Sequence, residues 1–416
     1  MSKFADRTHT PGKLFRLSML AGAVLALSAL AMAQAGQLDP SFGKKGIFVT
    51  NFTAFPNSAT AVALQSDGKI VVAGQTNSCS ACNPLGALLR LTTKGTLDTT
   101  FGSGGIVTNT FEIDRSTVVV GLAIQADGKI VAAACGLPGC GRVGRFNSDG
   151  SIDTTFGSNG FANSPVGGGP VALQPDGKIL VLGNGLERLD HNGQLDATFG
   201  NGGVANLLQG GSAIALQQDG KILIATSSFF GSSGSLARYN ANGSLDKSFG
   251  ISGQAASIAA PSAVAVQTDG KILAVGSTVS APSPSFPHPT GFGAVRFNSD
   301  GSIDTSFALR GGVTTVFPKE NASAASGVAL QSNGDIVAAG QAGDTTGSAS
   351  TSSFGLARYT SNGHLDSTFG KKGLVTTSFG SNAVAAIVGV VLQSDGKIVA
   401  AGGEGGQIVV ARYLAQ

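Results

Sequence analysis

One short signature recurs seven times along the chain, and this repetition restricts the possible folds more than any other feature. The signature reads Gln, any residue, Asp-Gly-Lys-Ile, with its Gln at positions 65, 125, 174, 217, 267, 331 and 393. Each copy lies between two short apolar runs, such as residues 61–64 and 71–74. Because Gly and Asp or Asn accept the positive φ of a tight turn, each copy predicts a β-hairpin.

Two further signatures follow each hairpin in a fixed order. The first places an Arg before Leu, Phe or Tyr, at positions 90, 145, 188, 238, 296, 358 and 412. The second contains Asp and, three residues later, a Phe, which recurs at positions 42, 101, 156, 199, 249, 307 and 369. The repeats are 43 to 64 residues long, which suits a four-stranded propeller blade and is too long for a solenoid rung. We therefore expect an all-β fold, a seven-bladed β-propeller with four strands per blade.

The phase of the repeat indicates a closed ring. The chain has an Asp-containing motif at residues 38–43 and a fourth-type strand at residues 47–50 before its first Gln signature. The last repeat stops after Arg412 and Tyr413, with no such element following. We expect the N-terminal strand to complete the last blade, because closure removes the open sheet edges that a solenoid would leave. Residues 36–416 then form one domain of seven repeats.

The Arg and Asp signatures keep a constant distance of eight residues, from 90 to 98 through 358 to 366. This spacing around a turn predicts an ion pair within each blade. Arg412 has no Asp after it, and Asp39 at the other end of the chain has no Arg before it. We therefore predict a structural ion pair between Arg412 and Asp39 where the ring closes. The repeated Phe is expected to fill the space between adjacent blades.

The three motifs also resemble those of the delta-60 repeat proteins of bacteria. The resemblance covers residues 37–414 and is carried by Val-Ala-Leu-Gln-x-Asp-Gly-Lys-Ile, Leu-Ala-Arg-Tyr-Asn and Ser-Leu-Asp-x-Ser-Phe-Gly, as approximated around Gln217, Arg238 and Asp246. It implies propeller-like repeats in a surface or secreted protein, with no activity common to the family. The sixth copy departs from the pattern at Asn333, Asp335 and Ala308, which we expect to weaken one turn.

The N-terminus has the organisation of a secretory signal peptide over residues 1–35. Lys13 and Arg16 precede a 17-residue uncharged stretch, residues 17–33, and small residues permit cleavage after Ala33 or Ala35. A membrane anchor is the alternative, because such a stretch is at the lower limit for a span. We expect cleavage and a secreted, periplasmic or cell-surface protein with no stable membrane span.

Removing this segment deletes four bases and one acid, so the formal charge falls from +3 to 0. A neutral mature chain offers no electrostatic basis for binding nucleic acid or anionic lipid.

The four cysteines, Cys79, Cys82, Cys135 and Cys140, lie in connections between second and third strands. Export favours two local disulfides, Cys79–Cys82 and Cys135–Cys140. A zinc site with four thiolates is the alternative, although the spacings do not match standard zinc knuckles. A redox-active Cys-x-x-Cys would need a helix N-terminus to lower its pKa.

We identify no catalytic or cofactor-binding residues. Residues 147–153 resemble a calcium loop, with oxygen-bearing side chains around Gly150, but lack the later bidentate Glu, so a Gly turn is the favoured interpretation. His191, His288 and His364 are not paired with a nucleophile. We expect no cofactor, with calcium or zinc as the alternatives.

The connections between second and third strands vary in length, and equivalent loops of a propeller point the same way. Neutral drift explains such variation as well as a recognition face does. We expect a non-catalytic scaffold or binding protein that presents this face to an extracytoplasmic protein or glycan. The alternative is a hydrolase or lyase with its site at the mouth of the central channel.

A first prediction concerns processing. The exported protein should lack the signal segment, because a charged segment, an apolar stretch and an Ala-x-Ala site follow one another. Intact-mass measurement of secreted material checks this. A mature species that retains Met1 would contradict it and favour the membrane anchor.

Overall fold

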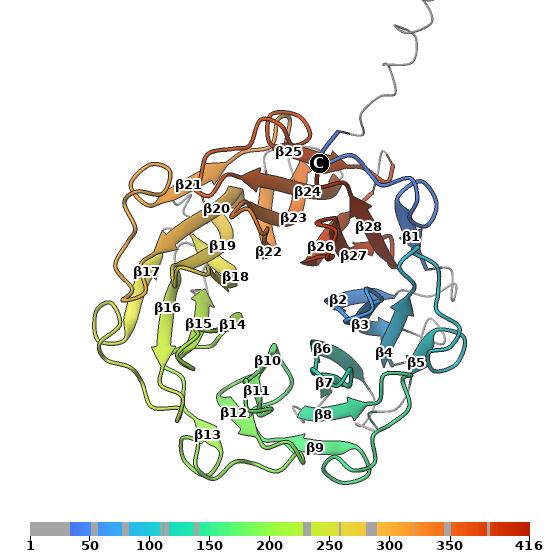
Figure 1. The fold of residues 1–416 in the computed structure, drawn as a ribbon, viewed down its shortest axis with the longest axis vertical. Coiled ribbons are helices and arrows are strands. Elements are labelled where there is room, and N and C mark those ends of the chain that lie inside the picture. The colour runs from blue at the N-terminus through green and yellow to red at the C-terminus, as the bar shows by residue number, and fades with distance from the viewer. Residues whose placement is uncertain are drawn as a thin grey trace, which may run out of the picture.

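The structure is a computed structural model that describes residues 34–50, 57–76, 83–108, 111, 116–136, 141–227, 234–257, 259–279, 289–320, 322–344, 351–380 and 383–416. These residues form 28 strands and no helix, and hence no helix that could cross a membrane. Seven four-stranded antiparallel blades surround a central axis (Figure 1). The predicted seven-bladed β-propeller is confirmed.

The strands run outward from the axis in chain order within each blade. Blade 1 contains β2 (Ser58–Leu64), β3 (Ile70–Thr76), β4 (Leu85–Leu91) and β5 (Ile106–Thr108), and blade 2 contains β6 (Thr117–Ile124), β7 (Ile130–Gly136), β8 (Gly141–Phe146) and β9 (Phe161–Ser164). Blade 3 contains β10 (Val171–Leu173), β11 (Ile179–Leu182), β12 (Leu186–Leu189) and β13 (Val204–Ala205), and blade 4 contains β14 (Ala213–Leu216), β15 (Ile222–Ser227), β16 (Gly234–Tyr239) and β17 (Gln254–Ser257). Blade 5 contains β18 (Ala260–Val266), β19 (Ile272–Val279), β20 (Pro289–Phe297) and β21 (Gly312–Thr315), and blade 6 contains β22 (Ala322–Leu330), β23 (Ile336–Asp344), β24 (Thr351–Tyr359) and β25 (Leu374–Thr377).

Blade 7 is built from both ends of the chain. Its order from axis to rim is β26 (Ala385–Leu392), β27 (Ile398–Glu404), β28 (Gln407–Tyr413) and then β1 (Ile47–Val49). The antiparallel register pairs Ile47 with Ala411 and Val49 with Val409. Figure 1 shows β1 lying on the outer side of β28. The N-terminal strand therefore closes the last blade, as the phase of the repeat predicts.

The second strand of each blade is buried on both faces because it lies between two neighbouring blades. In β3, all residues from Ile70 to Gly74 are buried, and β27 has the same pattern over its first five residues. Such strands are continuous apolar runs, in contrast to the alternating pattern of a strand with one wet face. The sequence of Ile, Val and Ala in these runs therefore specifies a strand that is covered on both sides.

The hydrophobic core consists of seven clusters, each between two adjacent blades, among the residues described. Each cluster contains one fully buried motif Phe. Phe101 of blade 1, for example, packs with Ile130 and Phe146 of blade 2. Gly150 of blade 2 has a φ of +88°, and a Cβ there would lie 2.8 Å from the Phe101 ring. The prediction that this Phe fills the space between blades is confirmed.

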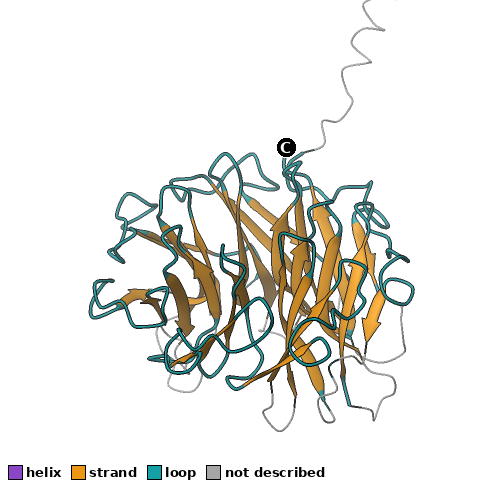
Figure 2. Ribbon diagram, turned by 60° about the horizontal axis from the view of Figure 1, so that its bottom comes forward, coloured by secondary structure: helices purple, strands orange, loops and turns teal. Residues whose placement is uncertain are grey.

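Connections lie at both ends of the strands (Figure 2), and the two faces of the ring differ in how much the lengths of these connections vary. On one face, which we name the turn face, every first-to-second connection has five residues, as in 65–69, and each third-to-fourth connection within blades 1 to 6 has 14, as in 92–105. The opposite face, the loop face, carries second-to-third connections of two residues (405–406) to nine (280–288). Length variation among these hairpins is therefore confined to the loop face.

A second prediction tests ring closure. Deleting residues 36–52 removes β1 and Asp39, which exposes the edge of β28 and leaves Arg412 buried without its carboxylate. We expect a loss of cooperative unfolding or aggregation, since breaking a buried ion pair costs about 3–5 kcal/mol. Thermal unfolding by circular dichroism, with light scattering, measures this against a control chain that starts at Gln34. A truncated chain that melts like the control would refute the structural role of the closure.

Candidate functional site

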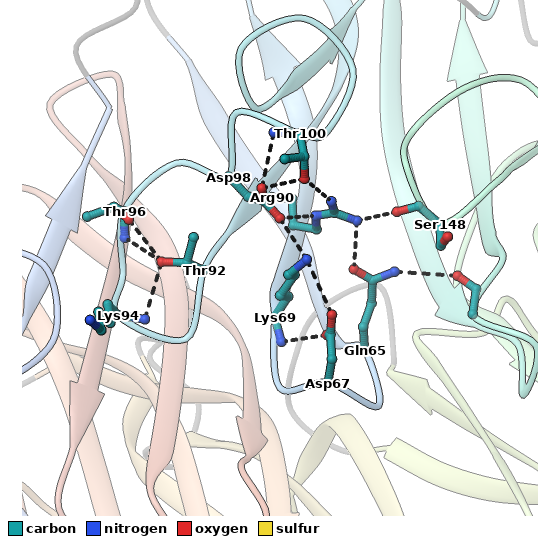
Figure 3. Close-up of polar contacts among 11 residues, drawn as sticks. Gln65, Asp67, Lys69, Arg90, Thr92, Lys94, Thr96, Asp98, Thr100 and Ser148 are labelled. Carbon is teal, nitrogen blue, oxygen red and sulfur yellow. Dashed lines mark hydrogen bonds and ion pairs between the residues drawn. The ribbon is translucent and has the colours of Figure 1, made fainter.

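The repeated polar residues meet in a cluster at the turn face of each blade, centred on the motif Arg. In blade 1, Nε of Arg90 lies 2.9 Å from Oδ2 of Asp98, and both side chains are about 95% buried. Lys69 places Nζ 3.1 Å from the same carboxylate oxygen. Nη1 of Arg90 donates to the Gln65 side chain and to the carbonyl of Ser148 in blade 2 (Figure 3). The cluster therefore joins two strands of its own blade to the next blade.

The same arrangement recurs around the ring. Arg and Asp are 2.7 to 2.9 Å apart in the pairs 90–98, 145–153, 188–196, 238–246, 296–304, 358–366 and 412–39. Each of these Arg guanidinium groups lies 4.5 to 4.7 Å from the centroid of a motif Phe ring. Each also donates to a carbonyl of the next blade, as Arg145 does to His191 at 2.6 Å. We name this arrangement the interblade clamp, and the predicted pairing over eight residues is confirmed.

The closing clamp joins the two ends of the chain. Nη2 of Arg412 lies 2.9 Å from Oδ2 of Asp39 and donates to the Ser41 hydroxyl at 3.0 Å. Nη1 of Arg412 donates to the Thr93 carbonyl of blade 1 at 2.6 Å. Lys397 lies farther from Asp39, at 3.6 Å. Three segments that are distant in the sequence thus meet at one guanidinium group.

The charges of the clamp are committed to the structure. Burial alone would raise the pKa of Asp98, but hydrogen bonds from Thr100 and Lys69 and the charge of Arg90 more than offset it. The pKa of Asp98 is therefore held well below its usual range, and the pKa of Asp39 is lowered in the same way by Ser41 and the nearby cations. These carboxylates stay ionised and paired, and they are poorly suited to proton transfer at neutral pH.

The strands nearest the central axis offer little acid–base chemistry. The seven inner strands, β2, β6, β10, β14, β18, β22 and β26, contain Ala, Val, Leu, Ile, Gly, Pro, Ser and Thr. None of these side chains titrates near neutral pH. In the described part of the chain, no three His, Cys, Asp or Glu residues are grouped so that they could hold a metal ion.

The structure places the individual candidates apart from one another. His191 and His364 are exposed in the third-to-fourth connections of blades 3 and 6. In the calcium-like loop, Asp149 accepts hydrogen bonds from the backbone and hydroxyl of Ser151, and Asp153 belongs to the clamp. This loop is therefore a turn whose oxygens already have protein partners.

Of the cysteines, Cys135 is described: it is half-buried near the end of β7 and has no disulfide partner among the described residues. Cys79, Cys82 and Cys140 lie outside the described residues, as does His288. The pairings Cys79–Cys82 and Cys135–Cys140 stay predictions.

Glu187 is an unusual titratable group that the repeat pattern does not reveal. It is fully buried in β12, at the position before the motif Arg, where the other blades have Leu, Gly, Ala or Val. Neither of its carboxylate oxygens makes a hydrogen bond of normal geometry with the described residues. Burial raises the pKa of Glu187 to about 7, and Ser164 and the backbone of Val166 oppose the shift only in part. A polar residue among apolar equivalents is the signal that could have identified it.

Comparisons with known proteins agree with this architecture. A family model described as "Domain of unknown function (DUF5122) beta-propeller" matches residues 65–101, 125–156, 174–199, 217–249, 267–307 and 331–369. No curated protein matches the chain.

Two solved structures show the likeness of fold. A catalytically inactive virginiamycin B lyase from Staphylococcus aureus with quinupristin is 13% identical, with a TM-score of 0.52, over 88% of this chain and 99% of the lyase chain. The WD40 domain of Pan2 from Neurospora crassa is 10% identical, with a TM-score of 0.50, over 92% of this chain and 98% of that one. Identities this low relate the folds and carry no statement about activity.

A third prediction concerns Glu187. Its pKa is raised on folding, so the folded state holds a proton that the unfolded state loses between about pH 4.5 and pH 7. The contribution of Glu187 to stability is therefore greatest below pH 4.5 and is lost as the pH rises to 7. We compare the free energy of unfolding of Glu187→Gln with that of the wild type. This difference should change by roughly 2–3 kcal/mol in favour of the variant from pH 5 to pH 8.

Urea unfolding at the two pH values measures this difference. Glu404→Gln, at the half-buried end of β27, is the matched control and should follow the wild type at both pH values. A Glu187→Gln variant whose stability relative to the wild type does not change with pH would show that this carboxyl group has no raised pKa.

Proposed function

We propose that this chain, which belongs to the DUF5122 beta-propeller family, is an exported, non-catalytic binding scaffold. Its loop face would recognise a protein or glycan outside the cytoplasm. A hydrolase or lyase at the channel mouth is the less favoured alternative, because the inner strands provide Ser and Thr hydroxyls but no acid, base or amine.

The contrast between the two faces carries this proposal. Turn-face connections keep the same length from blade to blade, because each holds the residues of an interblade clamp. Second-to-third connections on the loop face have no such shared task and range from two to nine residues. Recognition surfaces are usually built from loops of variable length and sequence on one face of a rigid scaffold.

The composition of the loop face suggests the chemistry of the partner. The sequences between second and third strands, together with those that join the fourth strand of one blade to the first strand of the next, are rich in Ser, Thr, Asn, Gly, Pro and Phe. They contain five charged residues, Glu112, Asp114, Arg115, Lys319 and Glu320. Hydroxyl and amide groups with a few aromatic rings recognise a partner through hydrogen bonds and apolar contacts, so a neutral glycan or a weakly charged protein surface is favoured over a polyanion.

The N-terminal segment and the resemblance to the delta-60 repeat proteins support export. The contacts of Ala35 favour one of the two predicted cleavage sites. Ala35 is 6% exposed, and its carbonyl accepts a hydrogen bond of 2.7 Å from Gly370 of blade 6. Cleavage after Ala33 would keep this contact, whereas cleavage after Ala35 would remove it. We therefore propose a mature chain that starts at Gln34, with the two local disulfides stabilising loops of blades 1 and 2.

A fourth prediction tests the loop face. We expect the mature chain to bind members of a glycan or extracellular-protein array. Three variants each replace one long connection, 77–84, 280–288 or 345–350, with the Gly-Asn-Gly of blade 3. At least one should weaken binding tenfold or more, since a hot-spot loop carries at least about 1.4 kcal/mol.

Ile251→Ser serves as the matched control, because Ile251 is 86% exposed on the turn face. It should leave the affinity unchanged. The assignment of the loop face would be overturned if all three loop variants retained binding. It would also be overturned if the turn-face control abolished binding. Turnover of an array ligand by the wild-type chain would favour the enzyme alternative.

A further inference from the structure

Blade 6 lacks one cation that every other interblade clamp contains. In blades 1 to 5, the turn lysine places Nζ 2.9 to 3.1 Å from Oδ2 of the motif Asp. In blade 7 the distance from Lys397 to Asp39 is 3.6 Å. Blade 6 has Asp335 at the lysine position, and Asp366 keeps Arg358 at 2.7 Å but has no lysine beside it among the described residues.

The backbone at this position does not change. Gly334 has a φ of +87°, close to the +80° of Gly68 in blade 1. The Asp335 amide donates to the Asn333 side chain at 3.0 Å, as the Lys69 amide does to Asp67. The turn around Asn333 and Asp335 therefore keeps the geometry of the other copies. Ala308, the third departure, has a φ of +45° at a position where the other copies have Gly, so the expected weakening applies to that turn. The difference from the other blades is confined to side chains, so the place of the missing ammonium group is preserved.

A groove between blades 6 and 7 contains this place. It has a volume of about 880 Å³ and is lined by Asp335, Arg358 and Asp366 of blade 6 and by Asp395 and Lys397 of blade 7, with Lys397 paired to Asp395 at 2.8 Å. The equivalent groove between blades 7 and 1 is lined by Gln393, Lys397 and Arg412 and has a volume of about 680 Å³. The groove that has no lysine beside its motif Asp is the larger of these two.

The exchange also alters the charge of the groove. An ammonium group is replaced by a carboxylate, while the Arg and Asp of the clamp remain. One oxygen of Asp335 accepts a hydrogen bond of 2.7 Å from Asn333, which is a neutral partner. The exchange makes the groove more negative by two charges than it would be with a lysine at this position. Its lining side chains, Asp335, Asp366 and Asp395 with Arg358 and Lys397, carry a net charge of −1, which attracts a cation.

We propose that the groove between blades 6 and 7 binds a primary alkylammonium group, which occupies the lysine position beside Asp366. Lysines in six blades demonstrate that this clamp accepts an ammonium group on a four-carbon stem. The ligand is a free amine or the lysine side chain of a partner, since both present the same group. This site lies on the turn face and does not depend on the function proposed for the loop face.

Titration calorimetry at low ionic strength with n-butylammonium tests the proposal, with n-butanol as the neutral control. We expect saturable binding of one n-butylammonium per chain and none of n-butanol.

Asp335→Lys supplies the missing ammonium group and should weaken binding at least tenfold, while raising the melting temperature. Cadaverine and a capped Gly-Lys-Gly peptide are compared in parallel. Tighter binding of cadaverine indicates a free amine as the ligand, and tighter binding of the peptide indicates a lysine side chain.

A converse variant creates the same vacancy elsewhere. Lys178→Asp in blade 3 should add a second binding site, and Lys221→Asp provides the same test in blade 4 if the blade 3 variant does not fold. Unchanged stoichiometry in a folded variant would overturn the proposal. So would a wild-type chain that binds no alkylammonium, or an Asp335→Lys chain that binds it as tightly as the wild type.

Discussion

The fold depends on one buried guanidinium group in each blade. This group is held by a carboxylate of its own blade, lies over a Phe ring and donates to a carbonyl of the next blade. Desolvation makes a buried ion pair a weak source of net stability, but removing either partner is costly. Its main effect is therefore to fix the position of each blade relative to the next. The seven contacts together set the angles between neighbouring blades, and the sum of these angles determines whether blade 7 meets blade 1.

This constraint explains how the molecule divides its sequence between structure and recognition. The clamp uses nearly all the repeated charges, and it requires fixed connection lengths on the turn face. The loop face is free of the clamp, and its hairpins tolerate insertions at little entropic cost. The apolar second strands hold the two faces apart, so a change in one loop need not disturb the frame.

Most of the frame could be predicted from the chain, because a residue repeated seven times reports a contact made seven times. The motif Phe, the pairing of Arg with Asp and the position of β1 all follow from spacing and phase. The roles of Gln65 and Lys69 could not be predicted in this way, since they depend on which side chains of two hairpins meet in space. Glu187 and Asp335 depart visibly from the repeat, but the sequence does not show the consequence. The packing around them shows a buried carboxyl group in one case and an Asp without its lysine in the other.

The split blade has a consequence for the order of events during synthesis. β1 is made before every other strand of the ring, and its partner β28 is made after them all. The ring therefore cannot close until its last strand has been made, and pairing of these two strands has the largest loop-closure cost in the molecule. Until then blades 1 to 6 can form from contiguous chain, but β1 has no partner strand and the ring stays open. The seam between the two ends is therefore the last part of the ring to become ordered.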